Sequence, residues 1–354
     1  MAEQAFFLGK LAPELIEVAH RRYNILRTIG YMQPIGRRIL AERLDLPERT
    51  VRNDVETLRQ QELITAEAKG MSINPLGERL LEELSMLVHG LRGLDSLEKL
   101  LGTKLGVNRV VIVPGDIDVE SLAKKELGRV SAYYVNEILK DVRTAAVAGG
   151  TTLAEMAKHI IPQNRHDLLI LPARGGLGEQ LEIQANTITA KIAASLGANY
   201  RLLHIPDYMS RTSAEQLVND PYIAPILQMI RGADVLIHGI GDALEMAKRR
   251  GVSWEEIELL RNADAKGEAF GYYFDGQGSI IYSTPSIGLK LDDLGKINTV
   301  VALAGGNSKA QAIEAVTKAG YIDWLIIDEG AAWQIAKNLN LENAILGLHS
   351  TLLR

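Results

Sequence analysis

The sequence predicts two parts of different fold class. The first is an N-terminal helix-turn-helix with a β-hairpin wing, and the second is a doubly wound, mostly parallel, Rossmann-like α/β domain with a β-hairpin insertion. Residues 1 to about 105 carry leucine and isoleucine at helical spacing. From Arg109 onward, short apolar runs that end in glycine alternate with helical segments, as in a parallel sheet covered by helices on both faces. The 354 residues are also enough for two domains of roughly 100–200 residues each.

The composition excludes several classes of protein. Cysteine is absent, which removes disulfides, thiolate zinc sites and cysteine nucleophiles. The net charge of −5 excludes a protein that coats nucleic acid through bulk charge, but it leaves room for a local basic face, because charge acts over a Debye length of ~8–10 Å. No apolar run approaches the ~20 residues that span a bilayer, and the polar start does not resemble a signal peptide. We therefore expect a cytoplasmic protein with no membrane partner and no metal site.

Residues 35–64 have the layout of a helix-turn-helix. Pro47 fits the start of the second helix, where its missing N–H leaves no hydrogen bond unmade, and Glu48 adds an acid that is favourable at that end of the helix dipole. Residues 63–75 predict two short strands around Lys69-Gly70, a wing placed to lie over a phosphate backbone. The expected core residues are Ile39, Leu40 and Leu44 in the first helix and Val51, Val55 and Leu58 in the second.

The opposite face of the second helix carries side chains of the types that read DNA. Arg and Asn make bidentate contacts to guanine and adenine edges in the major groove. The residues expected to contact DNA are Arg37, Arg38, Arg49, Thr50, Arg52, Asn53 and Arg59. Residues 35–62 hold six Arg and six acids, so the segment is neutral and an ordinary helical hairpin is the alternative. Every basic residue of this segment is Arg, and a Gly-tipped hairpin follows it. Both features favour a DNA-binding module whose affinity depends on pairing of half-sites.

A leucine ladder follows the predicted wing. Its spacing alternates between three and four residues, as in a seam between paired helices, although Gly90 and Gly93 interrupt it. The ladder consists of Leu80, Leu84, Leu87, Leu91, Leu94, Leu101 and Leu105. Two interpretations stay open: a connector packed on its own domain, or a dimer helix.

The second half carries seven apolar runs that suit buried parallel strands. They are residues 109–115, 144–150, 167–176, 201–206, 234–241, 299–306 and 324–330. Residues 270–284 instead show two strand-like runs around Asp-Gly-Gln-Gly, which is a hairpin signal. We therefore divide the chain into a DNA-binding domain (1–88), a linker helix (89–105) and an effector-binding and oligomerisation domain (106–354).

One of these strand ends predicts a phosphate cradle. Gly149 and Gly150 follow a strand, and Thr151 and Thr152 open a clear helix. Free backbone N–H groups, the helix dipole and threonine hydroxyls together suit a phosphate. The alternative is a tight strand-to-helix turn with threonine as an ordinary cap. The loop matches neither nucleotide-binding glycine motif, so we expect no nucleotide and no cofactor.

Other strand ends bring cations to the same edge of the sheet. Arg174 lies in the loop after the third run, and Lys309 lies in the first turn of a helix, where it opposes the dipole unless an anion is nearby. Arg249 belongs to the basic run 248–250, which also fits a solvated helix end. Gln184 and Glu268 are suited to sugar hydroxyls. Cations on several loops indicate a ligand with more than one phosphate, or with phosphate and hydroxyls.

No catalytic set emerges from the sequence. His204 and His238 lie inside apolar runs and are expected as neutral core residues, whereas His159 and His166 flank a helix end. Neither the HExxH nor the GxSxG motif is present. We therefore expect no enzyme, an inference drawn from absence.

Blocks of sequence along most of the chain resemble the SorC family of sugar-responsive transcriptional repressors. The blocks are GDIDVESLAKKELG (115–128), VAGGTTLAEMA (147–157), LPARGGLGE (171–179), QANTI (184–188), HGIG (238–241), EAFGYYF (268–274), AGGNSKAQAIEA (304–315) and IIDEGAA (326–332). The resemblance implies a homo-oligomeric repressor of a glycolytic operon with fructose 1,6-bisphosphate as inducer. It also implies an effector domain similar to sugar-phosphate isomerases and deaminases that has lost catalysis.

The resemblance also assigns roles to residues of the C-terminal half. One phosphate would be held by Gly149, Gly150, Thr151, Thr152 and Lys309, the other by Arg174 and Arg249, and the sugar by Gln184 and Glu268. Two rival functions remain: a sugar-phosphate isomerase or deaminase with an appended helical domain, and a sugar sensor that acts through a protein partner. Residues 35–64 argue against the enzyme, which needs no helix-turn-helix.

Overall fold

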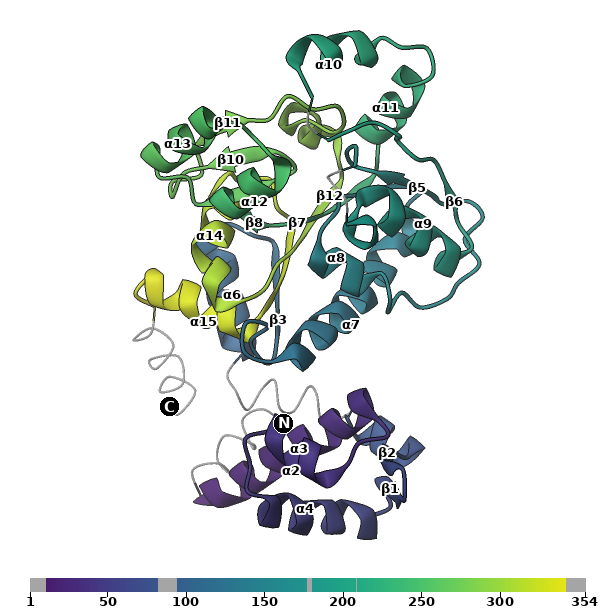
Figure 1. Ribbon diagram of the computed structural model, residues 1–354, viewed down its shortest axis with the longest axis vertical. Coiled ribbons are helices and arrows are strands. Elements are labelled where there is room, and N and C mark those ends of the chain that lie inside the picture. The colour runs from purple at the N-terminus through teal and green to yellow at the C-terminus, as the bar shows by residue number, and fades with distance from the viewer. Residues whose placement is uncertain (1–10, 82–93, 177–179, 208, 342–354) are drawn as a thin grey trace. The chain divides into compact units, whose positions relative to one another are not determined.

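The computed structural model describes residues 11–81, 94–176, 180–207 and 209–341. The chain divides into two compact units that meet in sequence between Asp95 and Ser96. In the part of the first unit that the structure describes, helices precede an antiparallel hairpin (Figure 1). These elements are α2 (Pro13–Met32), α3 (Arg37–Arg43), α4 (Glu48–Gln60), β1 (Ile64–Glu67) and β2 (Gly70–Ile73). The predicted winged helix-turn-helix is therefore confirmed as the fold of this unit.

The core of the first unit explains why these residues form these helices. Val51, Val55 and Leu58 of α4 are buried, as their spacing predicts. Ile39 is 52% exposed, so its expected place in the core was wrong. Neighbouring residues lie about 100° apart around a helix, and α3 turns Leu40 and Ala41 inward instead.

The wing is fastened to the helices at its tip. Gly70 has φ of 134°, and an added Cβ there would lie 2.9 Å from the backbone nitrogen of Ile35. Ile35 and Met71 exchange two backbone hydrogen bonds. Only glycine allows this close approach, so Gly70 fixes the position of the hairpin against residue 35.

The second unit is built on a seven-stranded parallel sheet with the order β3-β13-β12-β7-β4-β5-β6. The strands are β3 (Arg109–Val113), β4 (Thr144–Val147), β5 (Leu169–Pro172), β6 (Asn199–Tyr200), β7 (Val235–Gly239), β12 (Thr299–Leu303) and β13 (Trp324–Asp328). After β4 the chain builds outward through β5 and β6, whereas after β7 it builds the other way through β12 and β13. The topological switch point therefore lies between β4 and β7.

Helices cover both faces of this sheet, as predicted. The right-handed crossover rule puts α7, α8 and α9 on one face and α14 on the other, and Figure 1 shows them on opposite sides of the strands. The helices and 3-10 segments of this unit are α6 (Leu94–Leu105), α7 (Ser121–Ile138), η1 (Leu139–Asp141), α8 (Thr151–Met156), η2 (Leu181–Ile183), α9 (Ala185–Leu196), α10 (Arg211–Val218), α11 (Ala224–Arg231), α12 (Ala243–Arg250), α13 (Trp254–Asn262), η3 (Leu291–Lys296), η4 (Asn307–Lys309), α14 (Ala310–Lys318) and α15 (Glu329–Asn338).

The predicted hairpin insertion is present and belongs to a larger sheet. β10 (Tyr272–Phe274) and β11 (Ile280–Ser283) form the hairpin, and β8 (Gly241–Asp242) and β9 (Gly267–Ala269) extend it to four antiparallel strands. β8 and β9 were not predicted, because strands of two and three residues are too short to show a period.

The predicted strand 201–206 was wrong. The strand at this place is β6, which ends at Tyr200, and His204 in the following segment is exposed rather than in the core. The apolar residues of this segment are buried without strand pairing, because Leu203 and Ile205 point inward from an irregular loop. An apolar run alone does not distinguish a buried strand from the buried residues of an irregular loop.

The described leucines of the ladder are divided between the two units, and Leu80 packs against the core of the first. Leu101 and Leu105 of α6 are buried, and α6 lies against β3, where the Ile112 backbone N–H donates to Glu98. At these two positions the ladder packs on its own domain. Leu84, Leu87 and Leu91 lie outside the described residues. The boundaries predicted for the linker helix 89–105 stay a prediction.

Candidate functional site

A pocket opens at the topological switch point of the parallel sheet. The loops after β4 and β7 line it, with about 830 Å³ of space between atoms, counting its open mouth. This is the crevice in which ligands of doubly wound sheets bind. All nine residues predicted to bind the effector line it: Gly149, Gly150, Thr151, Thr152, Arg174, Gln184, Arg249, Glu268 and Lys309. Their contact with a ligand stays a prediction.

One side of the pocket is the N-terminus of α8. Gly150 precedes the helix with φ of 138°, a conformation that favours glycine, and its N–H donates to the carbonyl of Ile183. The N–H groups of Thr151 and Thr152 belong to the first turn, which has no acceptor inside the helix. Thr152 is buried and Thr151 is exposed. Both threonines line the pocket at this helix end.

Lys309 brings a cation to the pocket from the loop after β12. Burial lowers the pKa of Lys309, which Glu245 and Asp118 partly oppose. Within the described residues its ammonium has no ion-pair partner. An anion in the cradle would therefore stabilise the charged form.

The backbone of the Lys309 loop is already capped by carboxylates. The Gly306 N–H donates to Asp328, and the Ser308 N–H donates to Asp118 at 2.8 Å. The N–H groups of Gly306 and Ser308 are therefore not free to bind a ligand. The loop after β12 contributes the Lys309 side chain to the pocket. Arg249 lines the pocket from α12 and is exposed, with Nη1 3.8 Å from the sulfur of Met246.

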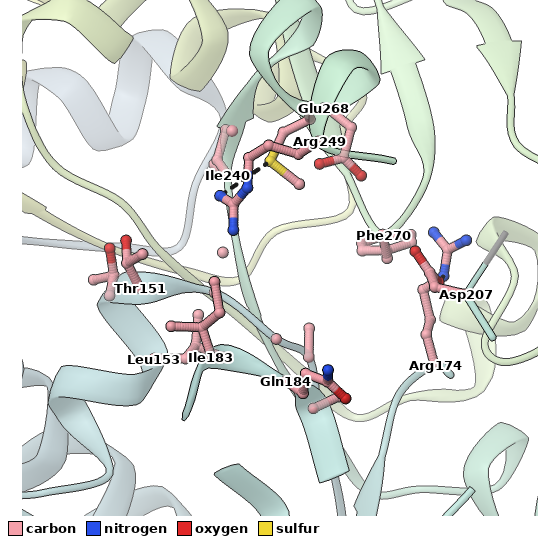
Figure 2. Close-up of a pocket in the computed structure, with 18 of the residues that line it drawn as sticks. Thr151, Leu153, Arg174, Ile183, Gln184, Asp207, Ile240, Arg249, Glu268 and Phe270 are labelled. Carbon is pink, nitrogen blue, oxygen red and sulfur yellow. Dashed lines mark hydrogen bonds and ion pairs between the residues drawn. The ribbon is translucent and has the colours of Figure 1, made fainter. Parts of the chain in front are cut away.

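The opposite side of the pocket is a buried cluster of four charged side chains. Figure 2 shows Arg174 and Asp207 across the pocket from Thr151. Arg174 Nε lies 2.7 Å from Asp207 Oδ1, and Arg250 Nε lies 3.0 Å from Asp207 Oδ2. Arg250 Nη2 also lies 2.8 Å from Glu268 Oε1. Each of these side chains is at most 5% exposed, so two guanidinium groups and two carboxylates form a neutral buried set.

The surroundings of this cluster affect its two guanidinium groups differently. Burial lowers the pKa of Arg174. Burial also acts on Arg250, but the carboxylates of Glu268 and Asp207 outweigh it and raise the pKa of Arg250. Both stay charged at neutral pH, because an arginine pKa starts above 12. Burial raises the pKa of Tyr273, whose hydroxyl accepts from Arg250, to about 12.

Glycine and a hairpin turn position the Arg174 guanidinium. Arg174 donates to the hydroxyls of Thr284 and Ser286. Gly271 has φ of 86°, and an added Cβ there would collide with Arg174. The tight turn between β9 and β10 therefore leaves the space that the guanidinium fills.

The sequence missed two charged residues and one aromatic residue of this site. Asp207 follows the segment that was mistaken for a strand. Arg250 was named only with the basic run 248–250, for which added cations and a solvated helix end both stayed open. The run divides on α12: Lys248 and Arg249 are exposed, whereas the Arg250 side chain is 4% exposed. Phe270 also lines the pocket. Only the tertiary structure separates the buried arginine from its exposed neighbours.

Aromatic packing behind the pocket encloses a histidine. His238 is fully buried in β7, as predicted, and its ring lies edge-on to Phe270 at 5.1 Å. Burial lowers the pKa of His238 to about 4. The residue is therefore neutral at physiological pH and belongs to the core.

The residues predicted to contact DNA belong to α3 and α4. Arg37, Arg38, Arg49, Arg52, Asn53 and Arg59 are exposed, and Thr50 is half-buried. A groove between α4 and the wing is lined by Arg37, Arg52, Arg59 and Lys69, with Glu56 and Glu67. Arg59 Nη2 lies 2.8 Å from Glu56, so part of its charge is paired.

Asp54 changes the charge count of the helix-turn-helix. Its carboxylate is buried and lies 2.6 Å from Arg21 Nε and 2.8 Å from Arg22 Nε, both in α2. One of the six acids in 35–62 is thus withdrawn from the surface and neutralised from outside the segment. The face of α4 is more basic than the sequence count indicates.

Within the described ranges, no helix is both long and apolar enough to cross a bilayer. No group of His, Asp and Glu side chains among those residues is arranged to hold a metal ion.

Comparison with known proteins matches both units. The model "CggR N-terminal DNA binding domain" covers residues 18–88, and the model "Putative sugar-binding domain" covers residues 90–337. A central glycolytic genes regulator of Priestia megaterium is 44% identical over 333 residues, 94% of this chain and 97% of the relative. This chain belongs to the central glycolytic genes regulator family. Another member, from Bacillus subtilis, is 38% identical over 93% of this chain and 97% of its own.

Solved structures connect the central glycolytic genes regulator family to SorC-type regulators. The crystal structure of a "putative SorC family transcriptional regulator" from Enterococcus faecalis is 40% identical, with a TM-score of 0.63, over 68% of this chain and 99% of that one. Full-length SorC from Klebsiella pneumoniae, at 18% identity, shows the same fold over 91% of this chain and 97% of its own, with a TM-score of 0.64. The chain is thus a sugar-responsive transcriptional regulator with a DNA-binding and a sugar-binding domain.

Proposed function

We propose that the protein represses a glycolytic operon by binding operator DNA through α3, α4 and the wing, and that fructose 1,6-bisphosphate weakens this binding. One observation supports the choice of a bisphosphate above the others. The pocket at the switch point has Thr151 of the α8 N-terminus on one side and Arg174 on the opposite side (Figure 2), and Lys309 also lines it.

Each side suits a phosphate for a separate reason. Thr151 and Thr152 offer amides and hydroxyls at a positive helix end, and Lys309 adds a charge. Arg174 offers a planar fork of donors on the other side, with Arg249 at the rim. Gln184 and Glu268 also line the pocket and suit sugar hydroxyls. A ligand that spans the pocket, with one phosphate at each end, could contact all nine residues predicted to bind the effector.

The response requires that sugar and DNA act on one equilibrium. A single neutral helix-turn-helix module supplies only part of the affinity for DNA. We therefore propose that the chain binds as a homo-oligomer, with two modules on two half-sites of the operator. The operator is in the cytoplasm, and we propose that the protein acts there. The effector changes how the modules pair. By linkage, operator DNA then changes sugar affinity by the same factor as sugar changes DNA affinity, typically 5–150-fold.

A salt-titrated gel shift on the DNA upstream of the gene tests this function. Fructose 1,6-bisphosphate should weaken the shift, and affinity should fall steeply with salt because α3, α4 and the wing contact phosphates. A gel shift that does not respond to fructose 1,6-bisphosphate would contradict its proposed role as the effector. An absent shift, with sugar binding retained, would favour a sensor that acts through a protein partner.

We also propose that the pocket binds without catalysis and needs no cofactor. Its buried carboxylate, Glu268, accepts from the Gly271 N–H and pairs with Arg250, which leaves it a poor general base. The relatives named above are transcriptional regulators. Incubation with hexose and pentose phosphates should give no interconversion, and measurable turnover would restore the isomerase or deaminase alternative.

A further inference from the structure

Asp207 lies where a phosphate of the proposed effector would have to go. Its carboxylate contacts Arg174 through one oxygen and Arg250 through the other, at 2.7 and 3.0 Å. Asp207 is 3% exposed and lines the pocket beside both guanidinium groups. It therefore occupies the bridging position between two arginines that an oxyanion favours.

The contacts of this carboxylate are close but poorly aligned. Among the described residues, Asp207 Oδ1, Arg174 Nε and Arg174 Nη1 are buried and make no hydrogen bond, although Oδ1 and Nε are at ion-pair distance. Buried donors and acceptors without partners cost free energy. The cluster thus has unused donor capacity on the same arginine that faces the pocket.

We propose that Asp207 is an internal anion that holds Arg174 and Arg250 in the sugar-free protein and is displaced by the second phosphate of the bound sugar. This inference rests on the proposed function, since it presumes a bisphosphate in this pocket. A phosphate has more oxygens and more charge than a carboxylate, so it can satisfy the unpaired donors of Arg174. Two anions cannot share this buried position without strong repulsion, so Asp207 leaves as the phosphate enters.

Displacement makes Asp207 a determinant of specificity. A sugar monophosphate bound in the α8 cradle presents a neutral hydroxyl to the cluster, and a neutral group does not displace a carboxylate from two arginines. Only a ligand with a second anionic group opens the cluster. Asp207 therefore lowers the affinity for every ligand that reaches Arg174 and makes the response depend on the second phosphate.

Displacement also moves a part of the chain that is tied to the pocket wall. The Asp207 N–H donates to the Gly176 carbonyl at 2.7 Å, and the Gly176 N–H donates to Ile205. Arg250 ends α12, in the insertion that carries Glu268. Release of Asp207 would thus loosen the link between the loop after β5 and the four-stranded sheet.

The test compares D207N with wild type in calorimetric titrations of fructose 1,6-bisphosphate and fructose 6-phosphate. D207N should bind the bisphosphate more tightly, on the order of tenfold, and change the monophosphate affinity by less than about threefold. D264N is the matched control, because Asp264 is exposed and its φ of 54° suits Asn. Equal or weaker bisphosphate binding by folded D207N would show that Asp207 only orients the arginines, and would overturn the proposal.

Two further arms separate this inference from the proposed function. Wild type that binds no fructose bisphosphate contradicts the proposed function, and melting with inorganic phosphate then decides the role of Asp207: phosphate should stabilise D207N more than wild type. If D207N does not fold, a wild-type crystal with the bisphosphate decides instead. An intact Asp207–Arg174 pair beside a bound second phosphate would contradict displacement.

Discussion

Arg21 Nε of α2 lies 2.6 Å from Asp54 Oδ2 of α4, and the Asp54 side chain is 3% exposed. Arg22 Nε contacts the other oxygen of the same carboxylate at 2.8 Å. Burial of the carboxyl acts to raise its pKa, but the hydrogen bonds from Arg21 and Arg22 outweigh burial and hold the pKa of Asp54 below its ordinary value. The helix that carries the predicted DNA-reading residues is thus fastened to α2 by one ionised side chain.

Replacing Asp54 with Asn should destabilise the first unit by about 2 kcal/mol, because it leaves two arginines without their carboxylate while both remain partly hydrated. Operator affinity should fall with it. Thermal melting of the variant measures the loss. D45N is the matched control, because Asp45 is exposed and its φ of 49° suits Asn. Equal melting of D54N and D45N would contradict a stabilising role for the pair.

The same pair sets an acid limit on the first unit. The folded pKa of Asp54 is depressed, so its contribution is complete above the unfolded pKa of about 3.9 and is lost as the pH falls through the folded value. The difference in melting between wild type and D54N should therefore be constant near neutrality and shrink below about pH 4. A difference that persists unchanged into strong acid would show that shape, and not charge, makes the contact.

Arg52→Ala should weaken operator binding by about 1–3 kcal/mol if this exposed side chain of α4 reads a base. The gel shift measures the affinity, and a panel of operator substitutions measures the specificity. Arg43→Ala removes the same charge from the far end of α3, outside the predicted contact set, and should change affinity less. An unchanged footprint for Arg52→Ala would move recognition to other residues.

The double substitution Thr152→Ala with Lys309→Ala should abolish the response to fructose 1,6-bisphosphate and leave sugar-free operator binding intact. It removes a hydroxyl and the one charge that the loop after β12 brings to the cradle. Lys248→Ala is the control, since Lys248 is exposed on α12 outside the pocket lining. Survival of a full sugar response in the double variant would show that the α8 cradle does not bind the effector.

Gly271→Ala should lower sugar affinity without changing any group that faces the ligand. A Cβ at this position collides with the Arg174 guanidinium, and φ of 86° is unfavourable for alanine. Gly276→Ala, in the turn of the neighbouring hairpin, meets only Lys266 Cγ at 3.9 Å and should bind normally. Titration calorimetry on both variants compares them, and identical affinities would exclude Arg174 as a ligand of the effector.

His238 should make the second unit sensitive to mild acid. Its folded pKa of about 4 lies below the unfolded value of 6.5, so the unfolded chain takes up a proton first and stability falls as the pH drops from about 6.5 to 4. The full loss is about 3 kcal/mol. His238→Asn should melt with a weaker pH dependence in this window, and exposed His166→Asn should behave as wild type. Parallel pH profiles for all three would place the acid sensitivity elsewhere.

Regular patterns made most of the fold predictable. The spacing of Val51, Val55 and Leu58 predicted α4, and apolar runs ending in glycine predicted six of the seven parallel strands. The two failures differ. Ile39 is apolar but exposed, whereas Leu203 and Ile205 are buried in a segment that is not a strand, so the apolar character of a residue alone decides neither its burial nor its secondary structure.

Some residues of the candidate site were predictable from the sequence and others were not. Gly150 and Thr152 were predictable because they are adjacent in sequence and share one helix end, where the chemistry is local. Asp207 and Arg250 were not, because 43 residues separate them and no local signal distinguishes a buried charge from a solvated one. Sequence places charges along the chain, whereas the fold decides which of them face each other.

The amino-acid order alone therefore determined the two fold classes and the family, and it predicted the DNA-reading helix and the cradle of glycines and threonines. The tertiary structure alone decided that nine residues from several segments line one pocket at the β4–β7 switch point, that Asp54 is withdrawn from the predicted DNA-contacting surface, and that Asp207 bridges two arginines on one side of the pocket. The physical reason is the separation along the chain over which each kind of interaction acts. Periodicity, capping and turn preferences act over a few residues, whereas burial and ion pairing depend on contacts between segments that only the packed sheet brings together.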